Sequence, residues 1–306
     1  MLTVLTWLWR QPRGRTIYTA DHVNIWAAMV RRNLSMPHRI ACVTSCAEGI
    51  DERVEIIDPP GDFEAVRIPT WPETMPQCLR RLSMFRPDAA DIFGDRFACM
   101  DLDCVVGGPL DPLFDREDDI VLYRGTSVSR PYNGSMLLLR AGSRPHVFTS
   151  FSPQEATRAG RRFLGSDQAW VAHALGSGEA TWTSRDGVCW RNHGNSDIAD
   201  ADPRVVFFPG DTKPWHFDDD WTLQHYRGDR GGRCLILGYA PTVWGEVTEA
   251  LRDGPFDAVI ASPEAAEHWP GEVMAVAHCD VEAERIAAQI GFDSVTFCGR
   301  TGRAAA

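Results

Sequence analysis

The chain has 306 residues, of which 44% are hydrophobic and 11 are tryptophan, so it can form one large domain or two of ordinary size. Its formal net charge of −11 argues against a broad basic surface, so neither nucleic acid nor anionic lipid is an expected partner. The nine cysteines, at irregular spacing, do not resemble a disulfide framework, and no apolar run approaches the roughly 20 residues of a transmembrane helix. These features predict a soluble, cytoplasmic protein.

The first hundred residues alternate short apolar runs with a helical period. Runs typical of strands lie at residues 2–9, 39–44 and 54–57. Between the first two, residues 21–34 place apolar side chains at the spacing of one helix face. A helix between consecutive strands indicates an α/β sheet. Residues 77–85 predict a short helix that carries Arg80 and Arg81.

An apolar run at residues 97–106 is interrupted by Asp101-Leu102-Asp103. In an extended segment the side chains at i and i+2 point the same way, so both carboxylates can face one point while Leu102 stays in the core. Two carboxylates brought together repel unless a cation lies between them, and Mg²⁺ and Mn²⁺ take oxygen ligands. The segment therefore predicts a metal site, with a solvated turn at the end of a strand as the alternative.

The remaining pattern continues beyond a glycine-proline break at residues 107–109. Strands are expected at 119–123, 135–140 and 204–208, and helices at 152–163 and 166–175. Residues 182–202 are rich in Gly, Asn and Asp and predict a loop. A composition shift at residues 227–233 separates a first domain, residues 1–227, from a second, residues 233–300. The second is predicted to be a small parallel α/β domain of unknown role.

Four polar segments are each weak signals, but their occurrence together in this order is specific enough to indicate a protein family. They are Asp101-Leu102-Asp103, the Tyr132-Asn133-Gly134-Ser135 turn, Asp167-Gln168, and the Gly-x-x-Lys-Pro-Trp of residues 210–215. Residues 1 to about 225 thereby resemble the family 8 glycosyltransferases, the retaining group that includes glycogenin and lipopolysaccharide galactosyltransferases, in their bacterial or phage form. The resemblance implies a GT-A fold, a mixed α/β sheet that binds a nucleotide-sugar at the carboxyl ends of its strands.

The same resemblance implies roles for the residues on the phosphate side. Asp101 and Asp103 would hold Mn²⁺ or Mg²⁺ on the donor's diphosphate, where the cation acts as a Lewis acid. Lys213 would add positive charge to the same phosphate, and Pro214 restricts Lys213 to an extended backbone. Gly210 would let the backbone approach the phosphates closely.

Further residues would hold the donor by the same resemblance. Arg81 would face the diphosphate, with its neighbour Arg80 as the alternative and a plain surface arginine as the ordinary explanation. Asn133 would hydrogen-bond the sugar, unless it only forms a turn. Asp167 and Gln168 would contact the sugar near its anomeric carbon, while Asp167 also suits a helix N-cap.

One position departs from the family pattern. The family carries a histidine as the third metal ligand where this chain has Phe207, and a phenyl ring cannot coordinate a metal. His216, directly after the Lys-Pro-Trp motif, is the candidate replacement, with His225 as a second. Otherwise the two aspartates and the donor phosphates hold the cation alone.

The sequence thus predicts a metal-dependent retaining glycosyltransferase that moves a hexose from a nucleotide-sugar, expected to be a UDP-sugar, to an unknown acceptor. One alternative is a nucleotidyltransferase, for which residues 10–15 would be the basic, glycine-containing loop. The other is a non-catalytic nucleotide- or sugar-binding descendant of the family, for which Phe207 is the best support.

Overall fold

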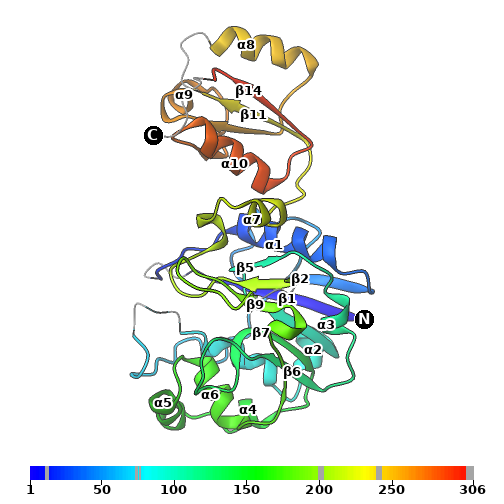
Figure 1. The fold of residues 1–306 in the computed structure, drawn as a ribbon, viewed down its shortest axis with the longest axis vertical. Coiled ribbons are helices and arrows are strands. Elements are labelled where there is room, and N and C mark those ends of the chain that lie inside the picture. The colour runs from blue at the N-terminus through cyan, green and yellow to red at the C-terminus, as the bar shows by residue number, and fades with distance from the viewer. Residues whose placement is uncertain (11–13, 73–74, 76, 199–202, 239–242, 301–306) are drawn as a thin grey trace. The chain divides into compact units, whose positions relative to one another are not determined.

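A computed structural model describes residues 1–10, 14–72, 75, 77–198, 203–238 and 243–300 (Figure 1). Its contacts divide the chain into two compact units, Met1–Asp218 and Asp219–Ala306. The composition shift at residues 227–233 lies within the second unit, after a short helix.

The first unit is built on a seven-stranded sheet (Figure 1). Its strands are β1 (Leu2–Leu8), β2 (His38–Thr44), β3 (Glu55–Ile57), β4 (Arg96–Met100), β6 (Ile120–Tyr123), β7 (Asn133–Arg140) and β8 (Ala180–Trp182). They lie in the order β3-β2-β1-β4-β7-β6-β8. Strand β7 is antiparallel to both neighbours and the other pairs are parallel. The predicted mixed α/β sheet is confirmed.

Helices bury the apolar faces of this sheet. They are α1 (Ala20–Asn33), the 3₁₀ helix η1 (Leu79–Phe85), α2 (Ala89–Phe93), α3 (Asp111–Phe114), α4 (His146–Thr149), α5 (Pro153–Arg162) and α6 (Asp167–Leu175). Side chains of η1, α2, α4, α5 and α6 share one buried cluster with strand residues. The sequence predicts α1, α5, α6 and η1 but not α2, α3 and α4, which are too short to show a helical period.

The first unit also contains a small second sheet, whose first strand directly follows β4 in the sequence. It contains β5 (Cys104–Val106), β9 (Val188–Trp190) and β10 (Val205–Phe207) in the order β5-β10-β9, with a 3₁₀ turn η2 (Ser184–Asp186) before β9. The predicted loop at 182–202 is therefore wrong where η2 and β9 lie, and its residues 199–202 are outside the described part. The chain leaves the large sheet after Met100 and enters the small sheet at Cys104. Asp101 and Asp103 thus lie in a bend between two sheets, not in one extended strand.

The second unit is a smaller, parallel α/β unit, as predicted. After α7 (Asp220–His225) it contains β11 (Arg233–Leu237), α8 (Val243–Ala250), η4 (Leu251–Asp253), β12 (Ala258–Ala261), α9 (Pro263–His268), β13 (Ala275–Val276), α10 (Asp280–Ile290) and β14 (Ser294–Cys298). The strands are all parallel, in the order β13-β12-β11-β14. Helices α8 and α9 pack in one apolar cluster and α10 in another.

Within the described ranges, no helix combines the length and apolar character that crossing a bilayer requires. All nine cysteines are free thiols, and most of them are buried as small core side chains.

Candidate active site

The carboxyl ends of β1 and β4 meet where the strand order reverses. The chain runs outward from β1 through β2 and β3, then returns to place β4 on the other side of β1. In open α/β sheets, ligands bind outside the carboxyl ends of the strands at such a point. Because β7 is antiparallel to β4, its first residues share this edge. The backbone N–H of Asp101, directly after β4, donates to the carbonyl of Ser135 in β7 at 2.8 Å.

Arg81, from η1, is the partner of Asp101. Its Nη1 donates to Asp101 Oδ1 at 2.8 Å, and its Nη2 donates to the Gly134 carbonyl at 2.5 Å. Its Nε lies 4.0 Å from Asp167 Oδ2, too far for a hydrogen bond. Arg81 is only 6% exposed, so it is not an ordinary surface arginine, whereas Arg80 forms its ion pair with a mostly exposed carboxylate elsewhere.

Lys213 is the partner of Asp103. Its Nζ lies 2.5 Å from Asp103 Oδ2 and also donates to the Phe208 carbonyl at 3.3 Å. The Lys213 side chain is 2% exposed, and its backbone is extended before Pro214, as predicted. The turn η3 (Pro214–His216) follows. Lys213 is also the one lysine among the 31 lysine and arginine residues of the chain, a compositional signal that points to this position.

The charges at this edge of the sheet shift the pKa values of the neighbouring acidic groups. Burial raises the pKa of Asp101, with Arg81 opposing the rise and Asp103 adding to it. Burial together with the charges of Asp103 and Asp101 raises the pKa of Tyr18, so its hydroxyl stays protonated as a donor. The site therefore brings two carboxylates and two buried cations together in a water-poor environment, where each charge depends on its partner.

Two amide side chains lie beside the ion pairs. Asn133 Oδ1 accepts a hydrogen bond from the Ser135 N–H at 2.7 Å, and Gln168 Oε1 accepts one from the Gly134 N–H at 3.3 Å. A backbone N–H can only donate, so both contacts fix the amide oxygens as acceptors. Neither NH₂ group donates to an acceptor among the residues that the structure describes. These groups are therefore available to an oxygen of a ligand.

Asp167 is the first residue of α6 and does not cap it. Ser166 occupies the N-cap position, and its Oγ accepts from the Cys78 N–H at 3.0 Å and contacts Asp167 Oδ1 at 3.3 Å. A Cβ added to Gly134 would stand 3.3 Å from Asp167 Oδ2. The first turn of α6 thus packs directly on the start of β7, which leaves Asp167 facing Arg81.

The predicted phosphate loop is open at Gly210. This residue has φ +80°, which favours glycine, and nothing lies within 4 Å of the position of an added Cβ. The loop thus leaves space next to its backbone. Of the basic loop at residues 10–15, which the nucleotidyltransferase alternative requires, residues 11–13 lie outside the described part.

An aromatic cluster from distant parts of the sequence adjoins Lys213. The ring of Trp215 lies 6.1 Å from that of Tyr18 and 4.3 Å from that of His22, measured between centroids. Lys213 Nζ lies 6.0 Å from the centre of the Tyr18 ring. Tyr18 precedes α1 and His22 lies in its first turn, so only the fold brings them to Trp215.

His22 makes the stability of the protein depend on pH. Burial lowers its pKa from 6.5 to about 4, and the Thr19 N–H donates to its Nδ1 at 3.0 Å, which requires that nitrogen to be unprotonated. The unfolded chain binds the proton more readily than the folded chain, so stability falls as pH drops from about 6.5 to about 4, by no more than roughly 3 kcal/mol. Urea unfolding at several pH values should show this loss, and His22→Gln should remove it. The control His268→Gln, at an exposed site, should keep the wild-type profile.

Within the described part of the chain, the candidates for a third metal ligand lie in different settings. Phe207 is 3% exposed and its ring stacks on Tyr123, 5.2 Å between centroids, so it is a core residue. His216 accepts a hydrogen bond from the Lys213 N–H at its Nδ1, 3.3 Å away, and His225 belongs to the second unit. Among the residues with described positions, no group of three or more His, Cys, Asp or Glu side chains could hold a metal. Whether His216 could serve as the third ligand once a cation is bound therefore stays a prediction.

Comparison with known proteins adds similarity of fold. No family model and no curated protein matches the sequence. The galactosyltransferase LgtC, solved in complex with donor and acceptor sugar analogs, has a TM-score of 0.46 and 16% identity over 71% of this chain and 90% of that one. An active-site mutant of LgtC has a TM-score of 0.48 and 16% sequence identity, covering 87% of this chain and 99% of that one. The apo-form glycosyltransferase GlyE of Streptococcus pneumoniae TIGR4 has a TM-score of 0.45 and 12% sequence identity, covering 95% of this chain and 79% of that one. Likenesses at such TM-scores and identities do not decide function.

Proposed function

We propose that the protein is a GT-A-type glycosyltransferase that transfers a hexose, with retention of configuration, from a UDP-sugar to an acceptor hydroxyl. The observation that carries this proposal is the pair of ion pairs at the sheet edge, Arg81 with Asp101 and Lys213 with Asp103. They combine two oxygen ligands for a cation with two positive groups for a diphosphate, at the ligand-binding edge of an open α/β sheet. Retention rests on the family resemblance of the motifs alone.

The donor set suits a divalent metal in its chemistry, since both aspartates offer carboxylate oxygens. A bound Mn²⁺ or Mg²⁺ would act as a Lewis acid on the diphosphate. However, Asp101 and Asp103 already have cationic partners at 2.8 and 2.5 Å. If the aspartates are to bind a metal, Arg81 and Lys213 must release them and pair with another anion. The diphosphate of the donor would be that anion. The phosphates would also provide the ligands that the missing third side chain does not.

On the sugar side, the same edge offers hydrogen-bonding groups in fixed orientations. The NH₂ groups of Asn133 and Gln168 can donate to sugar oxygens, because their own oxygens are engaged by the backbone. The Asp167 carboxylate, held beside Arg81, can accept from a sugar hydroxyl. These residues would orient the sugar, while Lys213 and Arg81 would stabilise the negative charge that grows on the leaving diphosphate. Such electrostatic stabilisation is usually the largest single contribution to catalysis.

The direct test is release of UDP from UDP-sugars in the presence of Mn²⁺. We expect slow hydrolysis without an acceptor, and its loss in Asp103→Asn by at least about a hundredfold. Asp119→Asn is the matched control, since Asp119 pairs with Arg140 at 2.7 Å on the surface, where both side chains are 50% exposed. Equal loss in both variants, or hydrolysis unaffected by Asp103→Asn, would contradict the proposal.

Phe207, which cannot coordinate a metal, supports one other function, a nucleotide- or sugar-binding protein without turnover. The same assay separates the two functions, because such a descendant binds UDP-sugar and releases no UDP. Pyrophosphate release from a nucleoside triphosphate would instead identify a nucleotidyltransferase.

A further inference from the structure

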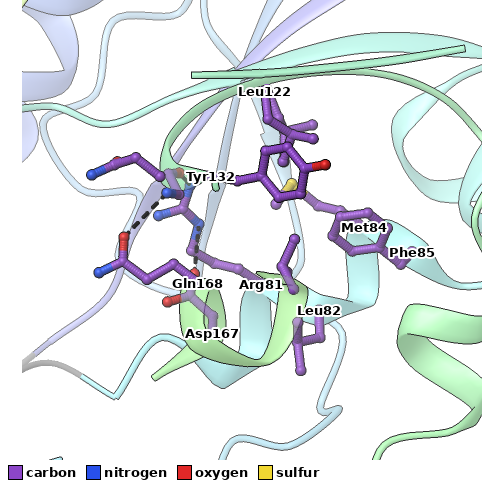
Figure 2. A pocket seen from close by; sticks show the side chains of 12 residues that line it. Arg81, Leu82, Met84, Phe85, Leu122, Tyr132, Asp167 and Gln168 are labelled. Carbon is purple, nitrogen blue, oxygen red and sulfur yellow. Dashed lines mark hydrogen bonds and ion pairs between the residues drawn. The ribbon is translucent and has the colours of Figure 1, made fainter. Parts of the chain in front are cut away.

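A cavity of about 20 Å³ lies directly beside the polar groups that we assign to the donor sugar. Arg81, Asn133, Asp167 and Gln168 contribute to its lining. The rest is mainly apolar and includes Leu82, Met84, Phe85, Leu122, Leu137 and Val171. Figure 2 shows Gln168, Asp167 and Arg81 on one side of this pocket and Met84 and Phe85 on the other. Residues with polar side chains thus line one side of the pocket, while the surface inside it is almost wholly apolar.

The size and lining of the cavity suit a methyl group better than a water molecule. A cavity needs at least roughly 10–15 Å³ to hold one water, and that water needs two to four polar partners. This cavity is large enough, but its exposed surface is almost wholly apolar. Apolar cavities of this kind stay dry and take apolar groups. An aliphatic group the size of a methyl is therefore the expected occupant.

The polar groups next to the cavity limit which chemical group of the donor sugar could carry this methyl. The NH₂ groups of Gln168 and Asn133 lack acceptors among the described residues, and each can donate to a carbonyl oxygen. The Asp167 carboxylate can accept from an N–H. An acetamido group has these three features: a carbonyl oxygen, an N–H and a methyl. A hydroxyl in its place would leave the cavity empty.

We propose that the donor sugar is an N-acetylhexosamine, whose acetamido methyl fills the cavity between η1, β6, β7 and α6. This inference rests on the proposed glycosyltransferase function and changes one part of it, because the transferred sugar is then an N-acetylated hexosamine and not an unsubstituted hexose. The discrimination comes from burying one methyl and pairing the amide, which together correspond to at least about a tenfold preference over the matching hexose donor.

The test is isothermal titration of the full chain, with Mn²⁺, against UDP, UDP-glucose, UDP-N-acetylglucosamine, UDP-galactose and UDP-N-acetylgalactosamine. We expect one N-acetylated donor to bind at least about tenfold more tightly than its hydroxyl counterpart. Val171→Leu adds a methylene at the cavity wall and should abolish the preference while hexose donors still bind. Val171→Ile, which also adds one methylene but keeps the branched Cβ, replaces that variant if it does not fold and should likewise abolish the preference. Val247→Leu, the same enlargement at a buried valine of α8, should leave the preference unchanged.

The outcomes separate the two proposals. Equal binding of both donor types, tighter binding of the hexoses, or an unchanged preference in Val171→Leu would overturn the acetamido proposal while UDP binding preserves the proposed function. Tighter binding of a 6-deoxyhexose donor than of either acetamido donor would also overturn it, since only the methyl would then be recognised. If neither UDP nor any sugar nucleotide binds, both proposals fail.

Discussion

Lys213→Met should reduce donor hydrolysis by at least about a hundredfold and lower the free energy of unfolding by roughly 3 kcal/mol. The ammonium is buried and lies 2.5 Å from Asp103 Oδ2. Its removal leaves a carboxylate that is only 18% exposed without a cationic partner, and such a loss costs far more than the loss of a surface pair. The measurements are urea unfolding and UDP release from the variant and the wild type.

A matched control exists for this prediction. Arg140→Met breaks the exposed Arg140–Asp119 pair and should cost less than about 1 kcal/mol, with unchanged activity. The double variant Lys213→Met, Asp103→Asn should regain part of the stability but none of the activity, because the charge is neutralised but the phosphate partner is still absent. Wild-type hydrolysis by Lys213→Met would refute the role of Lys213.

The second large effect concerns cooperativity between metal and nucleotide. Mn²⁺ should raise the affinity for UDP by about tenfold to a hundredfold, within the usual range of coupling between two ligands. The reason is the exchange of partners: Asp101 and Asp103 can accept a metal at low cost only when Arg81 and Lys213 gain the diphosphate. Either ligand alone would leave buried charges unpaired, which is strongly unfavourable. Titration of UDP with and without Mn²⁺ measures this coupling.

UDP also binds Mn²⁺ in free solution, so the coupling must be tested against a variant. Asp103→Asn should bind UDP with nearly the same affinity in both conditions, whereas the surface variant Asp119→Asn should keep the wild-type coupling. If Mn²⁺ increases UDP affinity equally in Asp103→Asn, the effect comes from the Mn²⁺–UDP complex and not from the aspartates. That result would leave the two ion pairs with a structural role only.

Local sequence patterns determined most of the fold and named most of the candidate site. The apolar period of residues 21–34 and the short runs of the main sheet predict α1 and the strands, because burial of one face is a local property of the sequence. The spacing of Asp101 and Asp103 indicates a metal site, whereas Arg81 and Lys213 are implied only by the family resemblance. The bend between β4 and β5 was not predicted, because both strands are equally apolar and only their pairing with β7 and β10 separates them.

Tertiary structure alone decided which groups meet. The pairing of Arg81 with Asp101 joins residues 20 positions apart, and that of Lys213 with Asp103 joins residues 110 apart. No periodicity encodes such a contact, since it depends on how strands and loops are ordered around the sheet edge. The cavity also exists only because four separate elements surround it. The sequence thus supplied the chemical groups, and the fold determined their partners, because ion pairing and packing depend on distances in space.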